Sequence, residues 1–218
     1  MKVNGLRWII LSLIMLVSII NYLDRGTLNY MWVANTKSEY PADRAVYDAA
    51  NGPYVLTAED GTTVVAPADR VAQQADGSYV YTAVGGIAAE LGILDPAMPE
   101  AEFKAQSKKL LADITIFFMI AYGLSQLFSG KLYDRIGTRR GFAFSALLWG
   151  AADAFTAFAA GFKSLTAFRF MLGLGEAGPW PGTTKSNAEW FPTKERALAQ
   201  GLFNASTSVG SILAPIVI

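Results

Sequence analysis

The chain has 218 residues, of which 52% are hydrophobic and 17% charged, and its 18 basic and 18 acidic side chains cancel at neutral pH. It contains no Cys and no His, which excludes disulfides, thiolate chemistry, an imidazole general base and zinc sites of the usual ligand types. Residues 35–108 hold 11 acidic and 5 basic side chains, so an acidic segment lies between basic flanks. We expect no enzyme activity, metal or cofactor.

Five apolar stretches are each long enough to cross a bilayer, which takes about 20 residues. They cover residues 8–34 (interrupted by Asp24-Arg25), 114–130, 141–161, 164–182 and 197–218. Several are apolar all round, which favours helices embedded in lipid over the one-sided stripe of a soluble helix. The sequence therefore predicts an all-α polytopic membrane protein, with helix one in 1–34, an insertion at 35–108 and helices two to five in 109–218.

The short basic connections predict the orientation, because loops rich in Lys and Arg stay in the cytoplasm. These basic residues are Lys2 and Arg7 before helix one, Lys131, Arg135, Arg139 and Arg140 between helices two and three, and Lys194 and Arg196 between helices four and five. We expect a cytoplasmic amino terminus, a bacterial inner-membrane location and a periplasmic insertion. The chain stops in apolar sequence, which indicates an amino-terminal fragment; a natural five-helix protein is the alternative.

Charged residues inside membrane spans are costly and are therefore candidates for function. The five are Asp24, Arg25, Asp153, Arg169 and Glu176. Arg169 and Glu176 lie two helical turns apart on one stripe, which we expect to face an aqueous cavity, whereas the adjacent Asp24 and Arg25 point to different neighbours. Guanidinium groups bind carboxylates or phosphates, and a buried carboxylate can carry a proton. The pattern indicates proton-coupled uptake of an anion; interhelical salt bridges are the alternative. Asp153 has no partner at helical spacing, so a structural and a coupling role both stay open for it.

Small residues and prolines gather in GLGEAGPWPG, residues 173–182. Glycines permit close helix approach and proline bends a span, so this segment indicates packing, a bend at a moving interface, or both. Asn204 on helix five is a candidate contact for a polar ligand or for a neighbouring helix. Lys185 and Glu189, four residues apart, are expected to form a surface pair or to bind lipid headgroups.

Several motifs carry a family resemblance. GKLYDRIGTRR at 130–140 resembles the G-x-x-x-D-R-x-G-x-R-R signature of the major facilitator superfamily, and RFMLGLGEAGPWPG resembles its R-x-x-x-G-x-G signature. NYLDR and AEWFPTKERA are similar to the anion:cation symporter family, with the nearest likeness to hexuronate, glucarate and galactonate transporters. The resemblance implies a twelve-helix, two-lobed transporter working by alternating access, with this chain as most of the amino-terminal lobe. Its partners would be a small sugar-acid anion, protons, the lipid bilayer and the missing carboxyl-terminal lobe.

Residue roles follow from the resemblance position by position. It implies proton coupling by Asp24 and Glu176, and substrate or coupling contacts by Arg25 and Arg169. Tyr122 and Gln126 match positions that line the sugar-acid site, with interfacial packing as the alternative. The signature loop, in which Asp134 and Arg135 would stabilise the outward-open state, has a conformational role; its residues are Gly130, Asp134, Arg135, Gly137, Arg139 and Arg140.

The insertion at 35–108 departs from the family, in which this link is usually short. It contains two similar segments, 41–57 and 67–82, which share Pro-Ala-Asp-Arg, then Asn-Gly or Asp-Gly, then Tyr-Val and Thr. The Asp60-Gly61 pair between two β-type runs predicts a hairpin, and 99–111 reads as a helix leading into helix two. We expect a small β-rich extracytoplasmic cap; a solvated insertion without a transport role and a partner-docking module are the alternatives.

The function that fits best is proton-coupled symport of a hexuronate, aldarate or aldonate. An organophosphate or phosphate exchanger would use the same arginines without titrating acids, and a non-transporting membrane sensor would use the insertion as its ligand module. Sodium coupling stays open. The basic residues of the loops are explained by the orientation of the chain in the membrane. They do not form the clustered basic face of a nucleic-acid binding surface.

Overall fold

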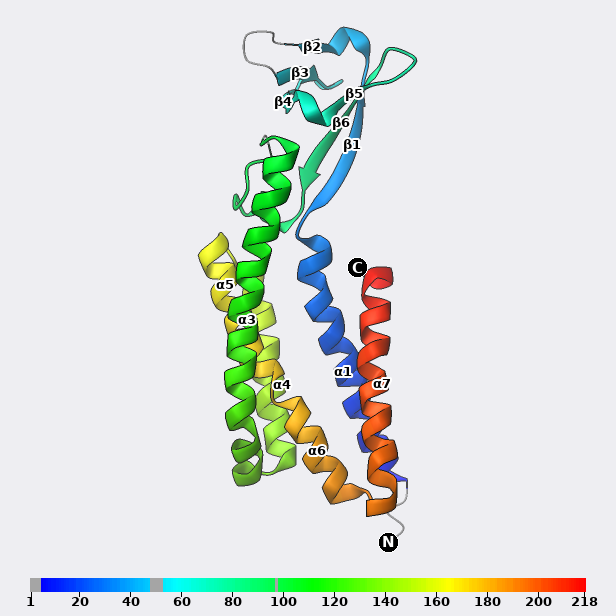
Figure 1. Ribbon diagram of the computed structural model, residues 1–218, viewed down its shortest axis with the longest axis vertical. Helices are drawn as coiled ribbons and strands as arrows, with labels where there is room; N and C mark the ends of the chain where they lie inside the picture. The colour runs from blue at the N-terminus through cyan, green and yellow to red at the C-terminus, as the bar shows by residue number, and fades with distance from the viewer. Residues whose placement is uncertain (1–4, 48–52, 97) are drawn as a thin grey trace. The chain divides into compact units, whose positions relative to one another are not determined.

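The computed structural model describes residues 5–47, 53–96 and 98–218, and it divides into two units, coloured along the chain in Figure 1. The first, which we call the helical unit, comprises Met1–Tyr30 and Ala112–Ile218, and the second, the insertion unit, comprises Met31–Leu111. The helices outside the insertion are α1 (Leu6–Met31), α3 (Glu100–Ile136), α4 (Thr138–Thr156), α5 (Phe162–Glu176), α6 (Pro179–Trp190) and α7 (Thr193–Val217). Lys2, one of the basic residues that predict the orientation in the membrane, lies outside the described residues.

Each predicted apolar stretch lies largely in helix, and the fourth is divided into α5 and α6. Ala177 and Gly178, between these helices, keep helical backbone angles, with φ of −69° and −64°. The hydrogen-bonded ladder breaks here because Pro179 and Pro181 have no N–H to donate. The break therefore falls where the sequence predicts a bend.

Two helices in the described part of the chain, α1 and α3, are long and apolar enough to cross a membrane. The other three predicted spans stay predictions. Their helices are diluted by small and polar residues, as in NASTSVG of α7, and the fourth is divided at Gly178.

The helical unit exposes apolar side chains and buries charged ones. Leu127, Leu147 and Phe158 are 71%, 74% and 76% exposed, whereas Glu176 and Arg169 are 1% and 7% exposed. Water would favour the opposite distribution, and large exposed apolar surfaces mark contact with another apolar phase. The exposed surface of the helical unit is therefore suited to contact with lipid.

Glycines set the close approach of these helices. A Cβ on Gly173 of α5 would lie 2.5 Å from the carbonyl oxygen of Phe118 in α3, and one on Gly175 would lie 2.6 Å from the amide nitrogen of Trp149 in α4. A Cβ on Gly210 of α7 would lie 2.8 Å from the carbonyl oxygen of Ile19 in α1, and Figure 1 shows these two helices side by side. The packing role predicted for the glycines is confirmed for Gly173 and Gly175.

Tyr133 of α3 fills the space that three further glycines leave. Its ring is 1% exposed and occupies the positions that a Cβ on Gly141 or Gly182 would need, and its hydroxyl lies 3.3 Å from Ser145 Oγ and beside Gly178. One large aromatic side chain thus joins α3 to α4 and α6.

The signature segment 130–140 is not a loop. Gly130–Ile136 form the last turns of α3, and Arg139 and Arg140 lie in the first turn of α4. Gly137 alone is non-helical, and its φ of +81° is a conformation that glycine adopts without steric cost. The expected loop is therefore a one-residue turn between two helices.

The insertion unit contains two antiparallel sheets of three strands, in the orders β1-β6-β5 and β2-β3-β4. The strands are β1 (Ala34–Tyr40), β2 (Ala45–Tyr47), β3 (Pro53–Thr57), β4 (Thr63–Pro67), β5 (Val71–Gln73) and β6 (Tyr79–Gly85), joined by the short helices η1 (Ala42–Arg44), η2 (Ala68–Arg70) and α2 (Ile87–Glu90). Its core is formed by Tyr40, Leu56, Ala66 and Tyr81, all less than a tenth exposed.

The sequence repeat appears as a structural repeat. Each Pro-Ala-Asp-Arg segment forms a 3-10 turn that leads into a hairpin, β2-β3 in the first copy and β5-β6 in the second. The Asn51-Gly52 pair of the first copy lies outside the described residues. The Asp60-Gly61 turn joins β3 to β4, where Gly61 has φ of +84° and Asp60 accepts hydrogen bonds from Thr62.

The helix predicted for 99–111 is confirmed, because α3 begins at Glu100 and continues without interruption. Asp69 of η2 accepts a 2.6 Å hydrogen bond from the backbone N–H of Glu100, which satisfies one of the free donors at the helix start. Within the same unit, the indole N–H of Trp32 donates to the backbone and side-chain oxygens of Ser107.

Candidate functional site

The helical unit contains a buried ion pair between α1 and α5. The Nε of Arg25 in α1 donates to Oε2 of Glu176 in α5 at 2.5 Å, and the Glu176 side chain is fully buried. The Arg25 guanidinium also lies over the rings of Tyr22 and Tyr122, at 5.1 and 4.7 Å from their centroids. Cation–π contacts of this kind stabilise a guanidinium that is partly removed from water.

The five charged residues that the sequence predicts inside membrane spans belong to one electrostatic cluster. Asp24 interacts with Asp153 of α4 and with Glu176, and Arg169 interacts with all three of these acids. The neighbours Asp24 and Arg25 thus have different principal partners, as their angle around α1 predicts. Asp153, whose role the sequence left open, is a member of the cluster because α4 packs against α5.

The cluster retains unfilled hydrogen-bonding capacity. Among the described residues, Nη2 of Arg25, Nε of Arg169 and Oε1 of Glu176 are buried without a hydrogen-bond partner. Such atoms are costly to bury, and a ligand or an ordered water commonly satisfies them.

Arg25 and Arg169 line one small pocket of about 100 Å³. Its other lining residues are Leu28, Asn29, Ile114, Thr115, Phe118 and Met119. Arg169 therefore reaches a cavity as predicted, while Glu176 is not among the lining residues and pairs with Arg25.

Tyr122 and Gln126 of α3 interact with each other, and Tyr122 also interacts with Arg25. Neither lines the pocket. Phe118, one turn before Tyr122, does line it, and its ring lies 5.5 Å from the Arg25 guanidinium carbon. The sequence reading missed Phe118, although its spacing of four residues from Tyr122 places it on the same helix face.

Asn204 of α7 has a different set of partners. It accepts a 3.3 Å hydrogen bond from Gln200, which in turn accepts one from the buried Asn187 of α6. The contacts of Asn204 in the described structure are thus with helix-packing residues and not with the charge cluster.

The signature segment is held by α6. Lys185 donates to Oδ1 of Asp134 at 2.8 Å and to the carbonyl oxygen of Tyr133, and Glu189 accepts a 2.8 Å hydrogen bond from the hydroxyl of Thr138. The expected surface pair between Lys185 and Glu189 is therefore wrong, because each reaches across to the α3–α4 turn. In the described structure the exposed Arg135, Arg139 and Arg140 form no ion pair.

A protein-family model described as the Major Facilitator Superfamily matches residues 75–218. This is well over half of the chain and includes the signature segment, the Arg169–Glu176 helix and all of α4 to α7. The chain belongs to the Major Facilitator Superfamily. It is therefore an integral membrane protein, in agreement with the exposed apolar surface of its helical unit.

Curated relatives of this chain carry transport names, among them three from different organisms. The chain is 39% identical over 98 residues to a galacturonate transporter of Dickeya chrysanthemi, covering 45% of this chain and 28% of the relative. It is 38% identical over 98 residues to a hexuronate transporter of Escherichia coli K12 (45% and 23%), and 33% identical over 101 residues to a probable sulfoacetate transporter of Cupriavidus necator (46% and 24%). The chain thus spans about a quarter of the length of the relatives that it matches.

Proposed function

We propose that the protein containing this chain is a secondary active transporter that carries a small organic anion, a sugar acid such as a hexuronate, together with protons by alternating access. The observation that carries this proposal is the buried cluster of Asp24, Arg25, Asp153, Arg169 and Glu176, two of whose members line a pocket. Charges buried in a membrane bundle are expensive and typically mark a substrate or ion pathway.

The two arginines provide the anion site in this proposal. Planar guanidinium groups bind carboxylates with paired hydrogen bonds, and both Arg25 and Arg169 have unfilled donors. The pocket of about 100 Å³ is smaller than the roughly 300 Å³ at which small-molecule sites begin, so it suits a carboxylate group and not a whole sugar. We propose that segments corresponding to the rest of the relatives' length complete the site around the sugar.

The charge balance of the cluster supports proton coupling. Three carboxyl groups face two guanidinium groups, so uptake of one proton would neutralise the cluster before a substrate anion enters. We assign this role to Asp24 and Glu176 and add Asp153, which interacts with both. Tyr122 and Gln126 would contact the substrate beyond Arg25, and Asn204 would join them only after a rearrangement of its bond to Gln200.

The remaining assignments concern orientation and conformational change. We propose a cytoplasmic amino terminus, which places the α3–α4 turn inside and the insertion unit in the periplasm. The Asp134–Lys185 pair would then hold the inner ends of α3 and α6 together in one transport state and release them in the other.

The test is uptake of radiolabelled galacturonate and glucuronate into proteoliposomes that contain the complete gene product. We expect uptake to rise with an inward proton gradient. Glu176→Gln should abolish gradient-driven accumulation while leaving substrate counterflow measurable, and Glu102→Gln, which removes an exposed acid on α3 outside the charge cluster, is the control. Full accumulation by Glu176→Gln would exclude its coupling role, and phosphate exchange without any proton dependence would instead support an exchanger.

A further inference from the structure

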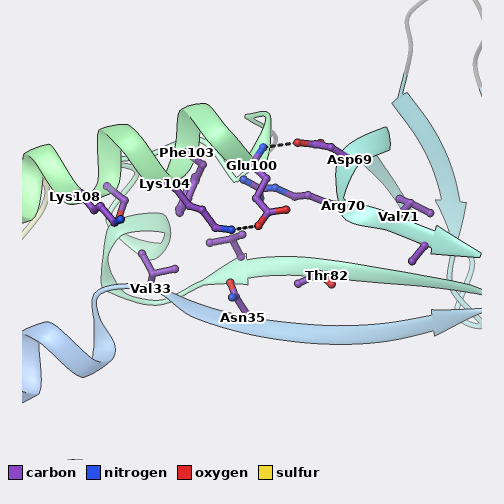
Figure 2. Close-up of a pocket in the computed structure, with 13 residues that line it drawn as sticks. Val33, Asn35, Asp69, Arg70, Val71, Thr82, Glu100, Phe103, Lys104 and Lys108 are labelled. Atoms are coloured by element: carbon purple, nitrogen blue, oxygen red, sulfur yellow. Dashed lines mark hydrogen bonds and ion pairs between the residues drawn. The ribbon is translucent and has the colours of Figure 1, made fainter.

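The insertion unit contains a pocket of about 360 Å³ between the start of α3 and the strands β1, β5 and β6. This volume is within the range of small-molecule sites. Figure 2 shows α3 on one side of the pocket and the strands on the other, with Arg70 at the end of η2 between them. The lining is Val33, Asn35, Asp69, Arg70, Val71, Ala72, Thr82, Val84, Glu100, Phe103, Lys104, Ser107 and Lys108.

Arg70 is a buried cation without an acidic partner in the described structure. It is 5% exposed, its Nη1 donates to the carbonyl oxygen of Pro96 at 2.6 Å, and its guanidinium carbon lies 4.9 Å from the Phe103 ring centroid. Its Nε and Nη2 have no hydrogen-bond partner among the described residues. A buried charge is normally paired, because an uncompensated one is strongly destabilising.

The two acids that line the pocket are already engaged. Asp69 accepts the backbone N–H of Glu100, and the Glu100 carboxylate pairs with Lys104, as the dashed lines in Figure 2 show. Lys108, one turn further along α3, lines the pocket without an ion pair in the described structure. The pocket therefore has an excess of positive charge even though the insertion as a whole is acidic.

The geometry of the free donors indicates the chemical group that fits. The Nε–H and one N–H of Nη2 lie on the same edge of a guanidinium plane and point in parallel, which matches the two oxygens of a carboxylate. Asn35 and Thr82 add neutral polar groups, and Phe103 and Val84 add apolar walls. Mixed walls of this kind suit a hydroxylated carbon skeleton.

We propose that this pocket binds a small hydroxylated carboxylic acid, with Arg70 holding the carboxylate and Lys108 adding a second positive charge. The insertion unit would then be a ligand-binding module with its own anion site. Only residues of the insertion unit line this pocket, so binding here does not depend on the anion site proposed in the helical unit.

The repeat supplies a matched control. Arg44 occupies the same place in the first Pro-Ala-Asp-Arg segment as Arg70 does in the second, but it is only partly buried and is not among the pocket residues. Substituting each arginine with glutamine therefore removes the same charge from the same local motif, and only Arg70→Gln should affect the pocket.

The experiment is lysine footprinting of the full chain in detergent, read by mass spectrometry, with galacturonate, glucuronate, neutral galactose and inorganic phosphate as separate probes. We expect galacturonate or glucuronate to slow modification of Lys108 severalfold, with no change at the exposed Lys37 and Lys109, which do not line the pocket. Arg70→Gln should abolish this protection and Arg44→Gln should retain it.

Because Arg70→Gln removes a buried group, far-ultraviolet circular dichroism must show that the variant is folded. Thr82→Val, which keeps the size of the side chain and removes one lining hydroxyl, provides a second variant and should weaken protection by the sugar acids. Absence of protection at Lys108 by both sugar acids, equal protection in Arg70→Gln, or protection by phosphate or galactose alone would each overturn the proposal.

Discussion

The two units of this protein distribute charge and apolar surface in opposite ways. The helical unit exposes Leu127 and Leu147 and buries Arg169 and Glu176, whereas the insertion unit surrounds Leu56 and Ala66 with an acidic surface. The same rule produces both patterns, since each unit presents to its surroundings the groups that those surroundings solvate. A buried arginine therefore has different surroundings in each unit. Arg25 and Arg169 interact with buried acids, whereas Arg70 forms no ion pair within the described residues.

The largest expected effect comes from removing one member of the buried pair in the helical unit. Arg25→Gln leaves the fully buried Glu176 without its partner, and breaking a buried ion pair in this way costs about 3–5 kcal/mol. Thermal unfolding of the chain in detergent, followed by circular dichroism, should show a large fall in the unfolding midpoint.

The matched control is Arg7→Gln on the same helix. Arg7 pairs with Glu195 at 2.9 Å, and the Glu195 side chain is 35% exposed, whereas that of Glu176 is fully buried. Water can solvate the carboxylate that Arg7→Gln leaves without its partner, so this loss should be smaller than the loss for Arg25→Gln. Equal shifts for the two variants would show that Glu176 is as well solvated as Glu195 and would contradict the burial of the charge cluster.

Gly175 and Gly201 differ in the space around their Cα atoms, since Gly175 lies against another helix and Gly201 does not. A Cβ on Gly175 would meet the α4 backbone at Trp149, and because backbone cannot yield as a side chain can, Gly175→Ala should destabilise by about 1–3 kcal/mol. A Cβ on Gly201 of α7 meets nothing within 4 Å, so Gly201→Ala should stabilise by about 0.5–1 kcal/mol.

Thermal unfolding in detergent measures both effects: we expect the unfolding midpoint to fall for Gly175→Ala and to rise for Gly201→Ala. A stabilised Gly175→Ala variant would mean that α5 and α4 are not in close contact in the membrane protein.

The pair between Asp134 and Lys185 should affect transport more than stability. Its side chains are 74% and 26% exposed, and surface pairs contribute about 0–1 kcal/mol, so Asp134→Asn should leave the unfolding midpoint nearly unchanged. We expect the same variant in the complete gene product to lower the rate of uptake. Unimpaired uptake by Asp134→Asn would show that Asp134 has no conformational role in transport.

The smallest expected effect concerns the two Asp-Gly turns of the insertion unit. Hydrogen bonds from the side chain and backbone of Thr62 lower the pKa of Asp60 below its usual 3.8, and those from Ser78 lower the pKa of Asp76 in the same way. A carboxylate with a lowered pKa contributes stability that is present above pH 3.8 and is lost as the pH falls through the folded-state pKa.

Carboxyl titration by NMR measures these values directly. Thr62→Ala should return the pKa of Asp60 towards 3.8 without changing that of Asp76, since the largest cause of the shift is the Thr62 hydroxyl. Simultaneous changes at both acids would show that the two turns are coupled.

Parts of the fold and of the site were predictable from local sequence. Helix positions followed from apolar runs, the break between α5 and α6 from Pro179 and Pro181, and the Asp60-Gly61 hairpin from its turn residues, because each depends on neighbours in the chain. The sequence singled out Asp24, Arg25, Arg169 and Glu176 because charge is costly in a membrane span, and the structure brings these four residues into one charge cluster.

Which of these residues meet depends on how the helices and strands pack against one another. Asp153 joins the cluster because α4 packs on α5, Asn204 bonds to Gln200 and not to the cluster, and Lys185 and Glu189 reach the α3–α4 turn instead of each other. The two Pro-Ala-Asp-Arg copies are alike in sequence, yet only Arg70 lies beneath α3 and its Phe103 ring. The reason is physical: sequence spacing fixes neighbours along one element, while burial and pairing depend on contacts between elements far apart in the chain.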